Sequence, residues 1–176
     1  MANNISSEIV AWTQIILDNY RRLVGKDLIV DRSISPLDQA HILKQASFVL
    51  VSHGPEADPI LNYGNQMALS LWEMSWDELT ATPSRLTAEP VNQEIRRQML
   101  HQVENQGFID NYQGVRISKS GQRFMIKQTT IWNLTDPAGN YCGQAATFEQ
   151  WQYLNDLQDP TKNPPADYPK QTGGLE

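Results

Sequence analysis

The feature that most constrains the fold is a long run of alternating side chains between residues 108 and 148. Apolar and polar residues alternate there with a period of two, which is typical of half-buried β-strands. Two turn sequences divide the run, Lys119-Ser120-Gly121-Gln122 and Asp136-Pro137-Ala138-Gly139. Because each turn is short, the sequence predicts three strands in an antiparallel meander.

Pairing the three strands about these turns assigns every side chain to one face of the sheet. The charged residues all fall on one face, the predicted outer face: Asp110, Arg116, Arg123, Lys127 and Glu149. The uncharged face is predicted to be the inner one, because a one-residue slip would mix the two sets. Its members are Asn111, Gln113, Val115, Ile117, Phe124, Ile126, Gln128, Thr130, Trp132, Cys142, Gln144, Ala146 and Phe148.

Helical patterns precede the meander. An apolar stripe predicts an amphipathic N-terminal helix that ends at Gly25, with Ile5, Ile9, Trp12, Ile16 and Leu23 on one side. A second helix is predicted over residues 36–45, and the N-cap residues Asn65 and Ser75 predict two short helices. A longer helix begins at Pro90, and its predicted buried stripe is Val91, Ile95, Met99 and Val103.

Two short strands are predicted among these helices, over residues 48–51 and 59–63. The order of elements from residue 48 onward is then β-β-α-α-α-β-β-β. It predicts an α+β domain in which helices cover one face of an antiparallel five-stranded sheet, with the amphipathic N-terminal helix in addition. Residues 160–176 contain four of the ten prolines, which predicts a disordered tail.

Composition narrows the range of partners and compartments. The chain has 14 basic and 20 acidic residues and a formal charge of -6, without a basic cluster, so a nucleic-acid partner is not expected. No apolar run approaches the roughly 20 residues of a membrane helix, so no membrane partner is expected either. One cysteine and no secretory signal predict a cytoplasmic protein.

Several short motifs resemble a known family. Tyr63, Asn65 and Ser75-Trp76-Asp77-Glu78-Leu79 are similar to motifs of the PAS domain. A closer likeness is to its MEKHLA branch, carried by Ala57-Asp58-Pro59-Ile60, Pro83-Ser84-Arg85, Gly107-Phe108-Ile109-Asp110-Asn111-Tyr112, Gly114-Val115-Arg116-Ile117-Ser118 and Gly143-Gln144-Ala145-Ala146-Thr147-Phe148. This branch occurs alone in bacteria and at the C-terminal end of some plant homeodomain leucine-zipper regulators.

The resemblance implies a domain division and a class of function. It predicts an N-terminal helical extension over residues 1–34, a PAS-like MEKHLA domain over 35–154 and a proline-rich disordered tail over 155–176. Since PAS relatives bind small molecules or partner proteins, it implies a non-enzymatic sensor that acts through protein contacts. The N-terminal helix and the predicted outer face are expected to form a homodimer, or else to pack on each other.

The predicted inner face offers a binding site for a small molecule of unknown identity. Buried amides without partners are unfavourable by roughly 1–3 kcal/mol each, so they need one another, water or a polar ligand. We therefore expect hydrogen bonds to a ligand from Asn111, Gln113, Gln128, Thr130 and Gln144. The expected apolar walls are Tyr63, Trp72 and Trp132. Two alternatives stay open: the aromatic residues are plain core, and the amides bond to one another and to helix termini or lie at strand ends near solvent.

Two residues invite cofactor hypotheses, and neither hypothesis is favoured. His101 lies on the helix from which some haem-binding PAS domains supply a ligand, and Cys142 is the only thiol. His101 falls off the predicted apolar stripe, and Cys142 lacks the helical motif of light-sensing flavin relatives. Neither haem nor flavin is expected, and no histidine or cysteine spacing predicts a metal site.

Two alternatives to the sensor stay open. One is a protein-interaction or dimerisation module whose filled core binds no ligand. The other is an enzyme on a cone-like α+β fold. No ionisable side chain lies on the predicted inner face to act as an acid or base, so no catalytic residue is assigned.

Overall fold

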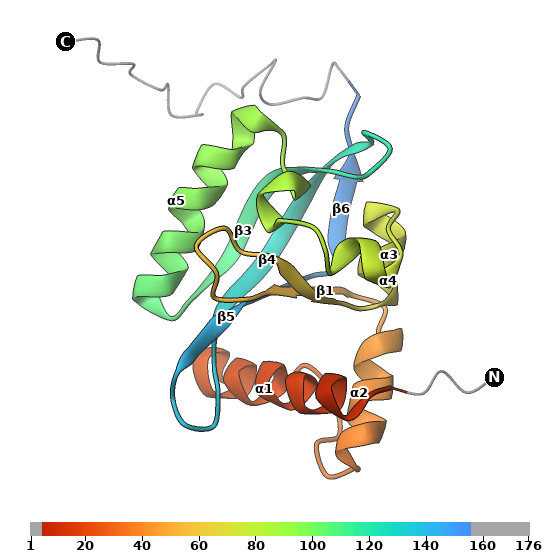
Figure 1. Cartoon of the computed structure of the whole chain (residues 1–176), viewed down its shortest axis with the longest axis vertical. Helices are drawn as coiled ribbons and strands as arrows, with labels where there is room; N and C mark the ends of the chain where they lie inside the picture. Colours follow the sequence, from red (N-terminus) through yellow and green to blue (C-terminus); the bar gives the residue numbers. More distant parts are fainter. Residues whose placement is uncertain (1–4, 156–176) are drawn as a thin grey trace.

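The computed structural model describes residues 5–155, so that the predicted tail lies, except for Asn155, outside the described residues. The strands are β1 Val49–His53, β2 Leu61–Gly64, β3 Phe108–Ile117, β4 Arg123–Thr135, β5 Tyr141–Phe148 and β6 Gln150–Tyr153. The helices are α1 Ser7–Val24, α2 Pro36–Gln45, α3 Gln66–Trp72, α4 Trp76–Leu79, the 3-10 helix η1 Ser84–Thr87 and α5 Pro90–Gln106. The predicted α+β class and order of elements are confirmed (Figure 1).

The strands form one antiparallel sheet in the order β2-β1-β5-β4-β3. A short sixth strand, β6, was not predicted. It follows β5 after the single residue Glu149 and pairs with the first half of β4, from Phe124 to Lys127. Four residues carry too little periodicity to identify such a strand from sequence.

Local capping chemistry places the short helices, as the sequence predicted. Ser75 and Glu78 form a capping box at the start of α4. Asn65, fully buried, caps α3, because its Oδ1 accepts from the backbone N–H of Ala68 at 3.1 Å. The same oxygen accepts from the N–H of Leu50 at 3.1 Å, and Nδ2 donates to the carbonyl of Phe48 at 2.7 Å. One side chain therefore joins the start of α3 to β1.

Helices cover both faces of the sheet, and we name each face by its long helix. On the α5 face, Met99 and Val103 of α5 pack against Ile131 of β4. On the α1 face, Tyr20 of α1 meets Trp132 of β4 edge-on, with ring centroids 4.8 Å apart. Figure 1 shows α1 and α2 together at the bottom of the view and α5 alongside β3 and β4. The sheet is thus the central layer of three.

α1 packs on the sheet of its own chain, which is one of the two arrangements that its apolar stripe predicted. Trp12 Nε1 donates to Ser52 Oγ on β1 at 2.9 Å. Asn19 Nδ2 donates to the carbonyl of Thr135, at the end of β4, at 2.8 Å. The apolar stripe is therefore covered within one chain, and the homodimer stays a prediction.

Two bulges with left-handed backbone change the alternation of the long strands. Gln128 in β4 has φ 48° and Asn111 in β3 has φ 57°, and the β3–β4 pairing shifts register between Ile109 and Tyr112. Before Gln128 the even-numbered Ile126 packs on the α5 face, and after it the odd-numbered Ile131 does. The predicted single inner face is consequently wrong for the second half of β4.

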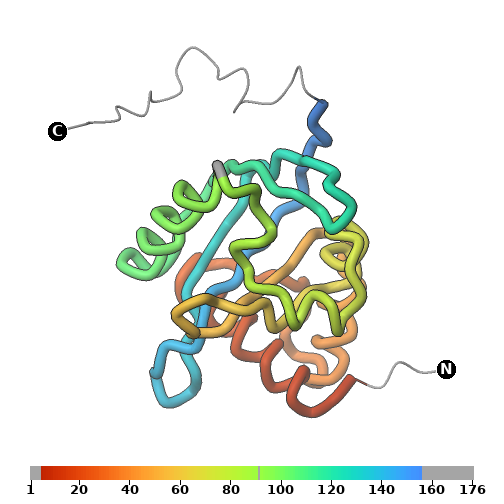
Figure 2. The backbone as a smooth tube through the Cα atoms, turned by 45° about the horizontal axis from the view of Figure 1, so that its top comes forward, coloured from red at the N-terminus to blue at the C-terminus, as the bar shows by residue number. Residues whose placement is uncertain are grey.

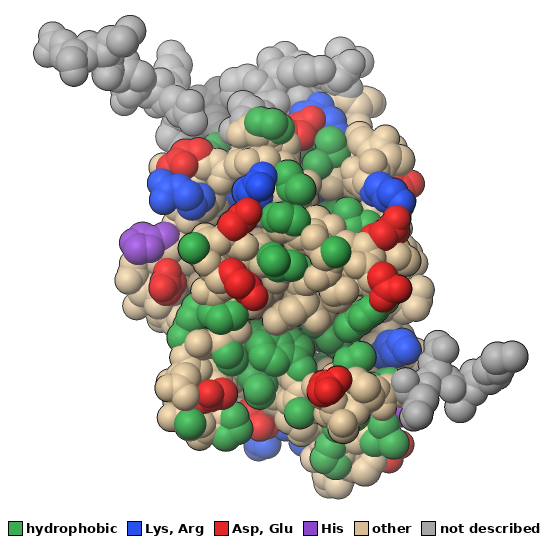
Figure 3. All heavy atoms as spheres, viewed as in Figure 1, with side chains coloured by type: hydrophobic (Ala, Val, Ile, Leu, Met, Phe, Trp, Pro, Cys, Tyr) green, Lys and Arg blue, Asp and Glu red, His purple; other side chains and the backbone are tan. Residues whose placement is uncertain are grey.

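The described part of the chain contains no membrane-spanning helix, and the visible face of the molecule mixes charges of both signs. Between residues 5 and 155 no helix is both long and apolar enough to cross a bilayer. On the face shown in Figure 3, lysine and arginine side chains are scattered among aspartate and glutamate.

The bulge in β4 gives a prediction about stability. A left-handed conformation is unfavourable by about 1–2 kcal/mol for a residue with a Cβ, and glycine avoids that penalty. Gln128→Gly should therefore raise the free energy of unfolding by about 1 kcal/mol, and Gln128→Val should lower it by a similar amount. The measurement is urea unfolding of both variants.

Lys127→Gly is the matched control, one residue away in backbone of ordinary φ. It should lower the free energy of unfolding by about 0.5–1 kcal/mol. Equal effects of glycine at positions 127 and 128 would contradict the proposed role of the bulge.

Candidate ligand pocket

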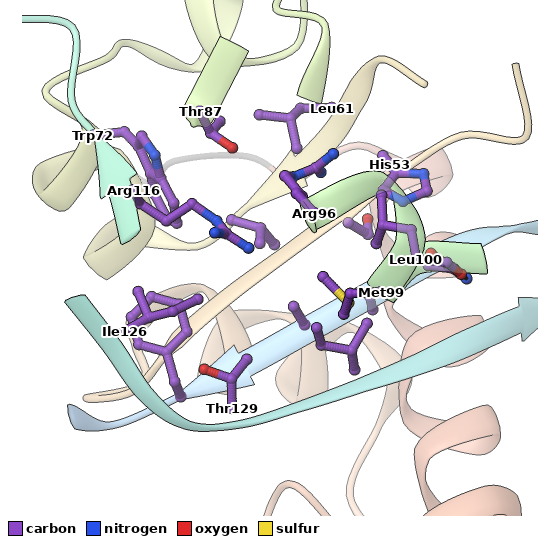
Figure 4. A pocket seen from close by; sticks show the side chains of 17 residues that line it. His53, Leu61, Trp72, Thr87, Arg96, Met99, Leu100, Arg116, Ile126 and Thr129 are labelled. Carbon is purple, nitrogen blue, oxygen red and sulfur yellow. The ribbon is translucent and has the colours of Figure 1, made fainter. Parts of the chain in front are cut away.

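A cavity lies between α5 and the α5 face of the sheet, next to α3 and η1 (Figure 4). Its volume is about 50 Å³, several times the roughly 10–15 Å³ that one water molecule needs. Most of the wall is apolar: Val51, Leu61, Trp72, Met99, Leu100, Ile126, Ile131, Ala145, Ala146 and Phe148. The polar residues that line it are Ser52, His53, Thr87, Arg96, Arg116, Thr129 and Gln144, of which Ser52 directs its hydroxyl to the α1 face. A largely apolar concave space with a few polar groups is typical of a small-molecule site.

Two arginines enter the cavity from opposite walls. Arg96 projects from α5 and is 8% exposed, and Arg116 projects from β3 and is 6% exposed. Arg116 donates from Nη1 to the carbonyl of Val115 at 2.8 Å, and its guanidinium lies 5.6 Å from the ring centroid of Tyr112. No aspartate or glutamate lines this cavity. The wall is therefore positively charged and apolar at once.

Arg96 differs from Arg116 in having no partner. Among residues 5–155 its guanidinium makes no hydrogen bond and no ion pair. Burial and the nearby charge of Arg116 lower the pKa of Arg96 to about 9. The side chain therefore stays charged at neutral pH, although its surroundings disfavour the charge.

His53 ends β1 at the rim of the cavity. Its Nδ1 lies 2.8 Å from the carbonyl oxygen of Gly54, to which it donates. In the neutral ring Nε2 is then an acceptor, and it is buried without a hydrogen-bond partner. Burial, together with the charge of Arg96, lowers the pKa of His53 below its ordinary value.

Two further polar atoms in the wall lack hydrogen-bond partners, whereas the side-chain amide of Gln144 is held by two hydrogen bonds. Trp72 Nε1 and Thr129 Oγ1 are buried without a hydrogen bond. In contrast, Gln144 Nε2 donates to the carbonyl of Leu100 and to Asn133 Oδ1, both at 3.0 Å. Gln144 thereby ties β5 to α5 and to β4 beside the cavity. The wall thus contains a fixed frame and several unused hydrogen-bonding groups.

A wider surface depression adjoins the cavity and shares four residues with it: His53, Arg96, Leu100 and Gln144. It lies between α5 and the loop that joins β1 to β2, which Figure 2 shows beside each other. Charged residues of both signs line it, among them an ion pair in which Arg85 Nε lies 3.1 Å from Asp58 Oδ1. The shared residues mark the route between cavity and solvent.

The structure brings only two of the eight predicted ligand-binding residues to this cavity, Gln144 and Trp72. Asn111, Gln113 and Gln128 are exposed. The other three do not line it either. Thr130 donates to Asp110 Oδ1 at 2.9 Å, and Tyr63 and Trp132 belong to the core beneath α1.

The two residues considered for cofactors also lie away from the cavity wall. His101 is exposed on α5, with Nδ1 3.7 Å from Glu104 Oε2. Cys142 packs against the core beneath α1, where burial raises the pKa of its thiol. Among residues 5–155 no cluster of three or more His, Cys, Asp or Glu side chains is placed to hold a metal ion.

Met99 and Val103 are buried as predicted, but Arg96 was missed because the buried stripe continues toward the start of the helix through other residues than the predicted ones. The buried residues are spaced by four, three and four: Asn92, Arg96, Met99 and Val103. Ile95, predicted to be buried, is 36% exposed. The heptad spacing is visible in the sequence, but its first two members are polar and read as a solvent face. Arg96 lies three residues before Met99 and seven before Val103, which places all three on one side of the helix. That spacing was the available signal.

Arg116 was placed on the wrong face because the first hairpin pairs one residue away from the assumed register. Arg116 lies opposite Phe124, and Ile117 lies opposite Arg123. Partners in a pair share a face, so Arg116 joins Phe124 on the α5 face, where Phe124 packs against Trp72. A slip of one residue moves every side chain of a strand to the other face. The prediction that Arg116 faces outward is therefore wrong.

Solved structures with the same arrangement of strands and helices are PAS and light-oxygen-voltage domains. A PAS domain of a Colwellia psychrerythraea protein matches with a TM-score of 0.56 and 15% identity, covering 66% of this chain and 94% of that one. A light-oxygen-voltage domain studied with a flavin analogue matches with a TM-score of 0.52 and 18% identity, over 68% and 87%. An RNA-binding light-oxygen-voltage receptor matches with 0.55 and 12%, over 78% and 37%. The fold is therefore that of a PAS domain.

The sequence identifies the branch within this class. The family model of the MEKHLA domain matches residues 10–153, which include most of α1. The chain belongs to the MEKHLA domain family, as the motifs predicted. No curated protein matches the sequence.

The lone charge of Arg96 gives a second prediction. Replacing a buried, uncompensated charge with an apolar group of similar length is stabilising by about 1–3 kcal/mol. Arg96→Met should therefore raise the free energy of unfolding of protein refolded without small molecules. Arg97→Met is the control, because Arg97 is exposed and pairs with Glu94 at 2.7 Å, so its loss should lower stability by only about 0.3–0.5 kcal/mol. A destabilised Arg96→Met would contradict the assignment.

His53 gives a prediction about pH. Its pKa in the folded protein lies below the ordinary 6.5, so the unfolded chain binds the proton more readily. The stabilising contribution of the neutral ring is complete above about pH 6.5 and is lost as the pH falls below that value. Urea unfolding between about pH 7.5 and pH 5.5 should therefore show a steeper loss for the parent than for His53→Gln. Parallel pH profiles would count against a buried neutral ring.

Proposed function

We infer that the protein is a non-enzymatic sensor module that binds a small molecule in the cavity under α5 and acts through protein contacts. The observation that carries this proposal is the presence of unused polar atoms around a largely apolar cavity. Trp72 Nε1, Thr129 Oγ1 and His53 Nε2 all line the cavity, are buried and lack hydrogen bonds. A buried polar group without a partner is unfavourable by about 1–3 kcal/mol, and a ligand or water that reaches it removes that penalty.

The chemistry of the wall supports binding rather than catalysis. It offers one imidazole and two guanidinium groups, but neither a carboxylate nor a thiol. General acid–base catalysis commonly pairs a proton acceptor with a second titratable group near the reacting atoms. His53 lacks such a carboxylate partner in the wall, because its Nδ1 donates to a backbone carbonyl.

The site lies where its occupancy would affect several elements. Gln144 bonds to the carbonyl of Leu100 in α5 and to Asn133 in β4. A ligand between Arg96 and Arg116 would contact α5 and β3 together. Signalling by such a module requires that the bound state presents a different surface to a partner protein.

Native mass spectrometry of the gently purified full chain tests the proposal, together with an ultraviolet-visible spectrum. We expect a mass above that of the bare polypeptide, and extraction with accurate mass measurement then identifies the added compound. The spectrum separates coloured groups from colourless ligands. A flavin, whose analogue was used to study one of the matched light-oxygen-voltage domains, would be visible in it.

Ala146→Leu is the decisive variant, because Ala146 lines the cavity and a larger side chain fills the space. The variant should lose the bound compound while remaining folded by circular dichroism. Ala138→Leu, in the exposed turn between β4 and β5, should retain the compound. A bare parent chain, combined with no rise in melting temperature across a library of small metabolites, would contradict the proposal and favour the ligand-free interaction module.

A further inference from the structure

We propose that the ligand is an organic carboxylate, whose anionic end lies between Arg96 and Arg116 and whose apolar body lies against the wall of the cavity. The inference rests on the proposed function and specifies its ligand class. It goes beyond the family assignment, which names no ligand.

The first argument is the missing counter-charge. Two other arginines of low exposure have a carboxylate, since Arg123 Nε lies 3.0 Å from Glu89 Oε2 and Arg32 pairs with Asp18, whereas Arg116 in the cavity wall donates only to a backbone carbonyl. Arg96 is 8% exposed, whereas the side chains of Arg123 and Arg32 are 15% and 16% exposed. Among the described residues no carboxylate pairs with Arg96. The chain carries an excess of six acidic residues overall, yet none lines this cavity. An anion from outside the chain supplies what the wall lacks.

The second argument is geometry. Guanidinium groups are planar and bind a carboxylate through two parallel N–H donors. Arg116 is held in place by the Val115 carbonyl and by the ring of Tyr112, which leaves its remaining N–H groups for another acceptor. Arg96 enters the same cavity from α5, and in Figure 4 its guanidinium lies toward Leu61 while that of Arg116 points toward the middle of the cavity. A group fixed before binding loses less conformational entropy when the ligand arrives.

The third argument is the rest of the wall. Facing the two arginines are aliphatic and aromatic side chains from four elements: Leu61, Met99, Ile126, Ile131 and Phe148. Such a surface favours a ligand with an apolar body, because burying it gains about 25 cal/mol per Å². An inorganic anion would leave this part of the cavity unfilled. The combination of charge and apolar surface therefore favours an acid with a short aliphatic or aromatic body.

Matched pairs of acids and amides test the inference, because each pair differs in charge and hardly in shape. The probes are benzoate against benzamide and isovalerate against isovaleramide, with inorganic phosphate as a third arm. Binding to the full chain is measured by isothermal titration calorimetry at neutral pH, after small molecules have been removed by refolding. We expect at least one acid to bind more than tenfold more tightly than its amide, and phosphate to bind weakly or not at all.

Arg96→Gln should weaken binding of the acid by about ten- to a hundredfold, because a charge-assisted hydrogen bond is lost. Arg21→Gln is the control, because Arg21 is an exposed arginine of α1 that lines neither the cavity nor the adjoining depression, and it should leave the affinity unchanged. Circular dichroism and the melting temperature establish that both variants are folded. Arg116→Gln provides an independent second test of the same pair.

The outcomes separate the ligand class from the proposed function. Equal binding of acid and amide, or tighter binding of phosphate than of either acid, overturns the carboxylate inference while the pocket remains a binding site. If no probe binds, the compound extracted from the gently purified parent decides. A carboxylic acid there supports the inference, and a neutral compound overturns it. A bare parent chain and no binding by any probe would contradict both proposals.

Discussion

The left-handed backbone at Gln128 is the constraint on which the rest of the structure depends. It interrupts the two-residue alternation of β4, so that Ile126 before it and Ile131 after it both reach the α5 face. The residue after Ile131, Trp132, is thereby directed to the α1 face, where Tyr20 meets it. A regular strand would place Trp132 under α5 and fill the cavity. The bulge thus separates a packed layer beneath α1 from a hollow one beneath α5.

Buried polar atoms without a partner occur in both layers, but only those beneath α5 line a cavity. Beneath α1, Asn19 and Trp12 have hydrogen-bond partners on the sheet, whereas the hydroxyl of Tyr63 and Nε1 of Trp132 have none. Beneath α5, the hydroxyl of Thr129 is buried without a partner in the cavity wall. Proteins commonly retain locally unfavourable arrangements where function requires them, and the stability comes from elsewhere in the fold.

Sequence reasoning predicted what depends on neighbouring residues and missed what depends on pairing between strands. The caps at Asn65 and Ser75 were predicted because each bonds within three residues of itself. The face of Arg116 was not, since it depends on a hairpin register that local alternation leaves ambiguous by one residue. Arg96 was missed because arginine in an amphipathic helix ordinarily faces water. Of the site, Gln144 and Trp72 were found, and the charges that distinguish it were not.

One peptide bond in β4 joins the cavity to the N-terminal helix. Ile131 lines the cavity, and Trp132, the next residue, is fully buried against Tyr20 of α1. The partition between the two compartments is therefore only a single strand thick at this point. Close-packed interiors transmit small displacements. A ligand that displaces Ile131 on the α5 face therefore acts on the packing of Trp132 on the α1 face. Mechanically, α1 sits directly behind the cavity wall, in the position from which a change of occupancy reaches the outside of the molecule.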